Sequence, residues 1–211
     1  MATHRVVLMI LLTVIAGTVV AFAPEAAALP VPALSGAGDF GAIRPFALAS
    51  VLLTVACAAL MARGYAAASV GAVRPVAHFN TLLAGGVVVV AAANVALGAA
   101  ATGTVSGPGL LIVRDLCGFF GLMVLLLAWA GYRFAGVVPT VYLFVAAVFG
   151  RDRTVAGGAA WWAWPVSDSP GAHTWVMPGA LAVAAVTLVL ARGRWASSRA
   201  LIAQASDRQS G

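Results

Sequence analysis

Arg114 and Asp115, adjacent in the sequence, are the residues best suited to chemistry, because they lie inside a long apolar segment. Ionised side chains are costly in hydrocarbon, so an intramembrane pair marks a candidate transport path or internal polar site. Adjacent helical positions point about 100° apart, so we expect each side chain to find its partner on another segment. An equally weighted structural interpretation has Arg114 snorkelling to the outer headgroups and Asp115 near its helix N-terminus, where its charge suits the dipole.

Asn94 is a polar residue in the middle of another apolar segment. We interpret it mainly as a hydrogen-bonding contact between helices, and secondarily as part of a transport path. Arg114 shares a helix face with Gly118 and Gly121, which predicts a smooth surface for close helix packing. A packing role is also predicted for Gly85, Gly86 and Gly98. For Gly85 and Gly86 the alternative is a kink in the helix.

A tryptophan cluster closes a short apolar stretch, residues 155–166, ahead of the last long apolar segment; its members are Trp161, Trp162, Trp164 and Pro165. The simplest interpretation of such tryptophans is an aromatic belt at the membrane–water interface. The stretch is too short to cross a bilayer, but it fits a re-entrant or interfacial helix, which we favour over a plain loop. The cluster is therefore predicted to form an outer gate or an interfacial belt.

Signatures of catalysis and metal binding are weak. His4, His78 and His173 fall at the N-terminus, on an inner loop and on an outer loop, so they do not converge on one metal or haem site. The Ser-Asp-Ser of residues 167–169 and His173 include the residue types of a hydrolytic triad, but closeness in a loop does not orient a nucleophile and a base. Gly-x-Ser-x-Gly and Walker A motifs do not occur in the sequence. We therefore expect no enzyme activity, no metal and no cofactor.

The overall composition indicates what kind of secondary structure holds these residues. The chain has 211 residues, of which 63% are hydrophobic and 9% are charged, and its mean hydropathy is +1.03. A soluble domain of this length cannot bury so much apolar surface, whereas helices of roughly 20 residues cross a bilayer core of about 30 Å. The predicted fold class is therefore an all-α, polytopic membrane protein.

Six apolar stretches have the composition of membrane-crossing helices; they cover residues 6–23, 43–62, 79–101, 109–130, 134–149 and 174–190. The first resembles a secretory signal, but its length and the following Pro24 favour a retained span. Residues 24–41 carry several prolines and no periodic pattern, which predicts an exposed loop. The whole chain, residues 1–211, is interpreted as one membrane domain.

The arginine distribution sets the orientation, because cytoplasmic loops are enriched in basic residues. With both termini in the cytoplasm, most arginines lie inside, including those of the polar tail 192–211, while Arg44, Arg151 and Arg153 lie outside. All 12 basic residues are arginine, a bias typical of a GC-rich bacterium, so we expect a multi-pass protein of the bacterial inner membrane. The arginines are dispersed and not interleaved with aromatics, so no nucleic-acid binding is expected.

The layout resembles that of an ABC-2-type exporter permease. The stretch Arg114-Asp115-Leu116-Cys117-Gly118-Phe119-Phe120-Gly121-Leu122, followed by Trp162-Ala163-Trp164-Pro165 before the last span, is similar to small actinobacterial permeases of that group. The resemblance implies that two subunits line a path and that the outer re-entrant element gates release. It also implies that a separate ATPase docks on the cytoplasmic segment around Arg63, Arg74 and His78.

Two other functions remain open. The chain is alternatively a non-transporting assembly or scaffold subunit, whose glycine-rich faces contact other membrane proteins. A secondary transporter ranks third, because it would usually show internal repeats with broken helices, and residues 1–101 and 102–211 show no convincing repeat. In each case the expected partners are the lipid bilayer and further subunits of a homo- or hetero-oligomer.

Overall fold

The computed structural model describes residues 29–32, 40–68, 86, 89, 92–93, 107–150, 159–167, 169 and 171–191. The elements in these ranges are β1 (Leu29–Pro32), β2 (Phe40–Ile43), α2 (Pro45–Ala68), α4 (Gly107–Trp129), α5 (Tyr132–Phe149), and the 3₁₀ helices η1 (Trp164–Val166) and η2 (Ala172–Trp175). An α-helix over residues 176–191, called the C-terminal helix, follows η2.

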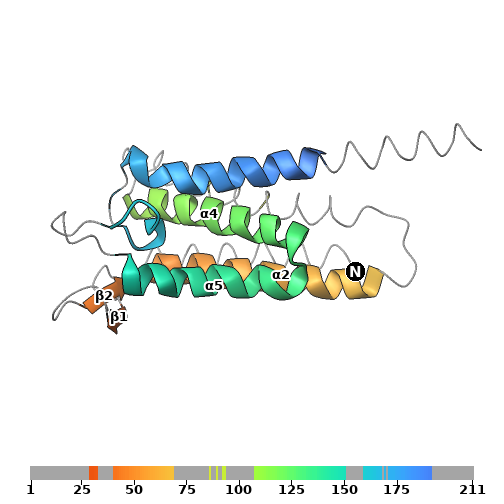
Figure 1. Ribbon diagram of the computed structural model, residues 1–211, viewed down its shortest axis with the longest axis horizontal. Helices are drawn as coiled ribbons and strands as arrows, with labels where there is room; N and C mark the ends of the chain where they lie inside the picture. The colour runs from red at the N-terminus through yellow and green to blue at the C-terminus, as the bar shows by residue number, and fades with distance from the viewer. Residues whose placement is uncertain are drawn as a thin grey trace, which may run out of the picture.

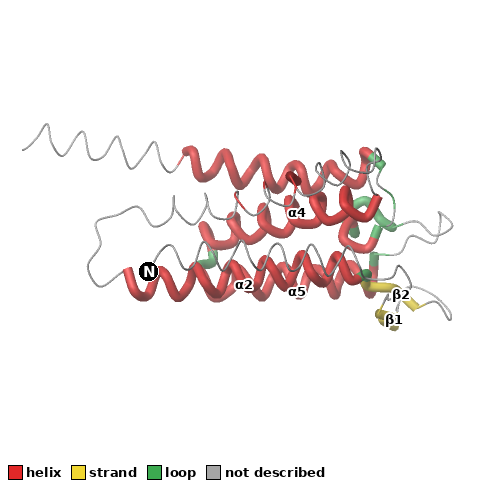
Figure 2. The backbone as a smooth tube through the Cα atoms, turned by 180° about the vertical axis from the view of Figure 1, so that it is seen from behind, coloured by secondary structure: helices red, strands yellow, loops and turns green. Residues whose placement is uncertain are grey.

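The long helices lie side by side in a bundle, with α2, α4 and the C-terminal helix running one way and α5 the other (Figures 1 and 2). Three helical segments are long and apolar enough to cross a membrane, namely Pro45–Ala62, Gly109–Trp129 and Ala172–Ala191, and Phe134–Phe149 is a shorter apolar helix. These four match the stretches predicted at 43–62, 109–130, 174–190 and 134–149. The described part of the chain is therefore a helix bundle of the membrane-protein type.

The remaining two predicted spans fall on other parts of the chain. The stretch 6–23 lies outside the described residues. Of the stretch 79–101, the structure describes only Gly86, Val89, Ala92 and Ala93, all of which are helical.

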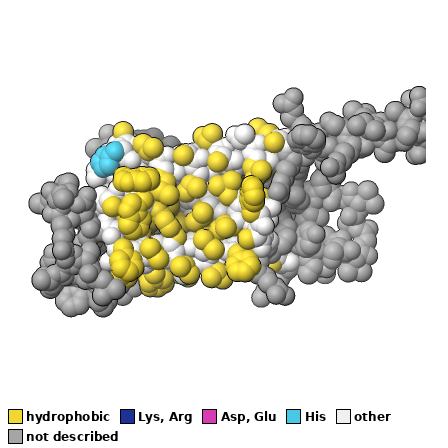
Figure 3. All heavy atoms as spheres, viewed as in Figure 1, with side chains coloured by type: hydrophobic (Ala, Val, Ile, Leu, Met, Phe, Trp, Pro, Cys, Tyr) yellow, Lys and Arg dark blue, Asp and Glu magenta, His cyan; other side chains and the backbone are white. Residues whose placement is uncertain are grey.

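The interior of the bundle holds two adjoining clusters of apolar side chains. One joins α2 to α4 through residues such as Cys57, Met61 and Met123. The other lies toward the β-hairpin end and includes Phe119 of α4 and Leu143 of α5. The opposite surfaces of the helices are apolar as well, and in the view of Figure 3 hydrophobic side chains cover the described part without a charged side chain among them. Apolar side chains on both faces are what a bundle in lipid requires.

A β-hairpin at one end of the bundle corrects the loop predicted for residues 24–41. Strands β1 and β2 pair antiparallel, with Leu29 opposite Ile43 and Pro32 opposite Phe40. The prolines of β1 lie two residues apart, so both can place their nitrogen on the outer edge of the hairpin, where no N–H is needed. The last strand residue, Ile43, is buried in the bundle, so the hairpin leads directly into α2.

A tight turn joins α4 to α5. Gly131 has φ of 79°, the left-handed region that glycine enters without steric cost. Its N–H donates to the carbonyl of Leu126 at 3.1 Å and so closes the end of α4. Further along α5, Pro139 lies inside the helix.

Candidate functional site

The candidate site centres on an ion pair within α4. Arg114 and Asp115 are both 0% exposed, and Nη2 of the arginine lies 3.0 Å from Oδ1 of the aspartate. The guanidinium Nε donates to the same oxygen at 3.1 Å. The expectation that each side chain finds its partner on another segment is therefore wrong for Asp115, because the long arginine side chain bends back along its own helix. The alternative of an arginine snorkelling to the headgroups is also wrong, because protein encloses the guanidinium.

Arg114 also binds the loop that precedes the C-terminal helix. Its Nη2 donates to the carbonyl of Ser167 at 3.2 Å, and its Nη1 donates to the carbonyl of Ser169 at 3.3 Å. The described residues of segment 162–174 are here called the cap. One guanidinium thus joins α4 to the cap while its charge is balanced by Asp115.

Trp164 inserts from the cap into the bundle. Its side chain is 1% exposed, and its ring centroid lies 4.8 Å from that of Phe119 and 5.8 Å from that of Tyr142. A Cβ added to Gly118 would lie 2.4 Å from Cη2 of the indole. Gly118 therefore leaves the space that the indole occupies, and Trp164 is an internal plug, not a member of an interfacial belt.

The structure corrects the helix predicted over residues 155–166. Residues 155–158 lie outside the described part, residues 159–163 are not helical, and only η1 is helical after them. Pro165 is buried next to Trp164, whereas Trp161 is 71% exposed and remains a candidate for the interfacial belt. Burial of Trp164 and its neighbours Ala163 and Pro165, and not helix formation, fixes the position of this stretch in the bundle.

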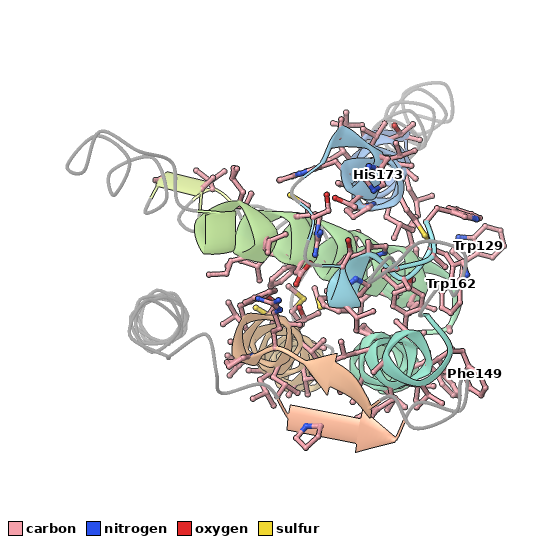
Figure 4. All side chains as sticks on the ribbon, turned by 90° about the vertical axis from the view of Figure 1, so that its left-hand side faces the viewer. Trp129, Phe149, Trp162 and His173 are labelled. Atoms are coloured by element: carbon pink, nitrogen blue, oxygen red, sulfur yellow. The ribbon has the colours of Figure 1, made fainter. Side chains whose placement is uncertain are left out.

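Tyr142 ties the start of the cap to α5. Its hydroxyl donates to the carbonyl of Trp162 and lies 3.7 Å from the sulfur of Met177 in the C-terminal helix. Figure 4, viewed along the bundle, shows Trp162 close to η1, while Trp129 and Phe149 point away from the bundle. The sequence did not single out Tyr142; a phenolic hydroxyl in the middle of an apolar helix was the available signal.

The second half of the cap is closed by its own hydrogen bonds. The hydroxyl of buried Thr174 donates to the carbonyl of Gly171 at 2.8 Å and reaches that of Ser169 at 3.1 Å. The Ser169 hydroxyl accepts the Gly171 N–H at 3.1 Å, and His173 is exposed. Ser169 is thus engaged in a turn, and this arrangement stabilises the cap.

At Gly121, α4 and the C-terminal helix are in close contact. A Cβ at this position would lie 2.7 Å from the carbonyl carbon of Leu181 and 2.8 Å from the nitrogen of Ala182, both in the C-terminal helix. At Gly86 a Cβ would meet nothing within 4 Å, so no contact at that point requires a glycine. Asn94, Gly85, Gly98, Arg74 and His78 lie outside the described residues, and Arg63 falls within α2.

One acceptor of the ion pair has no partner. Oδ2 of Asp115 is buried without a hydrogen bond, and Nε1 of Trp164 is likewise unpaired. Within the described ranges no group of three or more His, Cys, Asp or Glu side chains could hold a metal ion. The chemistry that the described geometry supports is therefore ion pairing and loop anchoring.

No family model, no curated protein and no solved structure matches the chain. The class is therefore defined by its own geometry as a membrane-type helix bundle with an internal ion pair and a capped end.

Proposed function

We propose that the chain is the membrane-spanning permease subunit of an ATP-driven, ABC-type exporter in the bacterial inner membrane. In this proposal six helices cross the bilayer, both termini are cytoplasmic, and two subunits line the path with a separate ATPase below them. The observation that carries the proposal is the cap, which Trp164 and Arg114 hold in one end of the bundle. A cap in this position is suited to gate the outer end of a path.

The direction of the helices supports the six-span topology. Helices α2 and α4 both begin at the end that carries the hairpin and the cap (Figure 1). The chain between Ala68 and Gly107 must therefore return to that end, which favours a span within residues 79–101. The hairpin, the end of α5 and the cap lie at this end as well, as expected of loops on the outer side.

The ion pair makes release of the cap physically reasonable. Arg114 contacts the cap through two carbonyls, those of Ser167 and Ser169, while its charge is balanced by Asp115 on the same helix. Hydrogen bonds to charged groups contribute about 1.5–3 kcal/mol each. When the cap leaves, these two bonds are lost but the pair stays neutral. The gate can therefore open without leaving an unpaired charge in the membrane.

A second function, that of a non-transporting assembly subunit, is favoured by a different observation. Several hydroxyls of the helices bond to a carbonyl of their own helix, including Ser50 to Phe46 at 2.9 Å and Thr54 to Ser50 at 2.8 Å. Arg114 is likewise satisfied inside the chain. Polar groups bonded in this way stabilise a bundle and are not free to contact a substrate.

Co-purification distinguishes the two functions. The tagged full-length chain is extracted from its native membrane in mild detergent, and the chains that accompany it are identified by mass spectrometry. We expect a stoichiometric subunit that carries a Walker A motif. Reproducible absence of such a subunit, with other membrane proteins present in fixed ratio, would favour the assembly role.

A further inference from the structure

We infer that the outward face of α5 is covered by lipid acyl chains of a locally thinned bilayer, an inference that does not rest on the exporter function. The face is a single stripe of large apolar side chains, each 40% to 56% exposed. Its members are Phe134, Val137, Val141, Phe144, Val145 and Phe149. We call these residues the α5 stripe.

The distribution of small residues on α5 identifies the occupant as lipid and not a second copy of the chain. Helices that associate in membranes bring small residues together, because small residues let the backbones approach. On α5 the small residues face inward: Ala135 and Ala146 are fully buried, and a Cβ at Gly136 would lie 3.6 Å from Ala58 of α2. The outward stripe is left with phenylalanine and valine, which suit contact with acyl chains.

The α5 stripe is short for a bilayer. From Phe134 to Phe149 the helix rises about 22 Å at roughly 1.5 Å per residue, whereas a typical hydrocarbon core is about 30 Å thick. The span Gly109–Trp129 of α4 has 21 residues, so from its first to its last residue it rises about 30 Å at the same rise per residue. The protein therefore presents one short apolar face beside helices of ordinary length.

Both ends of α5 are fixed, so the helix cannot extend to match a thicker core. At its start the Gly131 turn reverses the chain, and Arg133 follows within the first turn. At its end the N–H of Gly150 donates to the carbonyl of Ala146 at 2.8 Å, and the sequence continues with Arg151. Tilting would shorten the projection of the helix further, so the bilayer must adapt.

Exposed tryptophans flank both ends of the stripe: Trp129 lies five residues before Phe134, and the N–H of Ala160, the neighbour of Trp161, donates to the carbonyl of Gly150 at 2.7 Å. Trp129, 84% exposed, precedes the Gly131 turn, and exposed Trp161 follows the other end of α5 in the sequence. Tryptophan is enriched at membrane–water interfaces. We therefore expect the headgroup layers beside α5 to lie close to Phe134 and Phe149.

Spin-label depth measurements test the inference on the full-length chain. Single cysteines at Phe134→Cys, Val141→Cys and Phe149→Cys are labelled with a nitroxide and reconstituted in dioleoyl phosphatidylcholine vesicles. We expect all three labels to be accessible to oxygen, with Val141 deepest and both end positions at headgroup level. If the label at Phe134 or Phe149 has a depth inside the hydrocarbon core, the bilayer keeps its ordinary thickness and the inference is overturned.

The controls separate lipid from protein contact. The background carries Cys117→Ser, and without an added cysteine it must stay unlabelled, because Cys57 is buried. Val183→Cys, on an exposed position of the C-terminal helix, serves as the oxygen-accessible reference. If the Val141 label is protected from oxygen while the Val183 label is not, protein covers the stripe and the inference is wrong. Vesicles of 14-carbon chains, whose core is already thin, provide the positive control for end positions at headgroup level.

Discussion

The indole of Trp164 lies directly against the backbone of Gly118, so that a Cβ on the glycine would come within 2.4 Å of the ring. This contact joins the cap to α4 one helical turn beyond Arg114. The same face of α4 therefore holds the cap twice, once by an aromatic plug and once by a guanidinium. Variants at each contact separate their contributions.

Gly118→Ala should destabilise the protein by about 1–3 kcal/mol, because a methyl group displaces the indole from a filled interior. The measurement is the melting temperature in detergent, followed by size-exclusion chromatography. Gly179→Ala is the matched control, since a Cβ there meets nothing within 4 Å, and its melting temperature should not fall. Trp164→Leu combined with Gly118→Ala should cost less than the sum of the two single changes. Additive losses would contradict the contact.

Gly121→Ala should lower the melting temperature as well, because its Cβ would meet the backbone at Leu181 and Ala182, which cannot rotate away. Overpacking of this kind costs about 1–3 kcal/mol. The control is Gly136→Ala, whose nearest neighbour is the Ala58 Cβ at an ordinary 3.6 Å. If both alanine variants melt alike, α4 and the C-terminal helix are not in close contact.

Arg114→Met should be severely destabilising, with a loss of about 3–5 kcal/mol, because it leaves the carboxylate of Asp115 buried without a counter-ion. The double variant Arg114→Met with Asp115→Leu removes both charges and should recover part of the loss, but not the contacts to the cap. Membrane yield and melting temperature of the single and double variants are compared. A double variant worse than the single would show that Asp115 has another essential partner.

A double variant that folds also tests the role of the pair in transport. If the ion pair holds the gate of an exporter, the folded variant should show altered export. Full export at normal membrane levels would leave the pair with a structural role only.

Tyr142→Phe should cost about 0.5–1.5 kcal/mol, the usual net contribution of one hydrogen bond. It removes the donor to the Trp162 carbonyl while keeping the aromatic ring against Trp164. Thr187→Val is the control, because the exposed Thr187 hydroxyl bonds the Val183 carbonyl of its own helix, at 2.8 Å. Equal melting temperatures of the Tyr142 variant and the unsubstituted chain would show that the hydroxyl does not hold the cap.

The proposed topology places Asp168 outside and Arg199 inside the cell. A small tag inserted at each position should be reached from opposite sides of the membrane in intact cells. Labelling of both tags from one side would contradict the six-span arrangement.

The helices were predictable because each is a long, mostly apolar stretch, and its length separates it from loops and short strands. The hairpin was not, since Pro30 and Pro32 signal a loop unless the partner strand is known. The packing role of Gly121 followed from its spacing from Arg114. The insertion of Trp164 could not be predicted, because burial of a tryptophan depends on a space that another segment provides.

The partners of Arg114 show where sequence reasoning stops. Its side chain was correctly identified as unusual, but two of its acceptors are the backbone carbonyls of Ser167 and Ser169. Every residue carries such a carbonyl, so no residue type marks them. Its third acceptor, the neighbouring Asp115, was discounted because helix geometry separates the two Cβ directions, and the flexibility of the arginine chain outweighs that separation.

The adjacency of Arg114 and Asp115 has a consequence for biosynthesis. Their salt bridge needs no other segment, so it can form as soon as this part of α4 is helical. A lone arginine or aspartate in the middle of a helix costs about 2.5–3.5 kcal/mol on insertion into the membrane, and pairing lets the nascent helix enter as an electrically neutral segment. The carbonyls that complete the site follow 53 and 55 residues later in the chain. The helix can therefore be inserted first, and the guanidinium is already in place when the cap folds onto it.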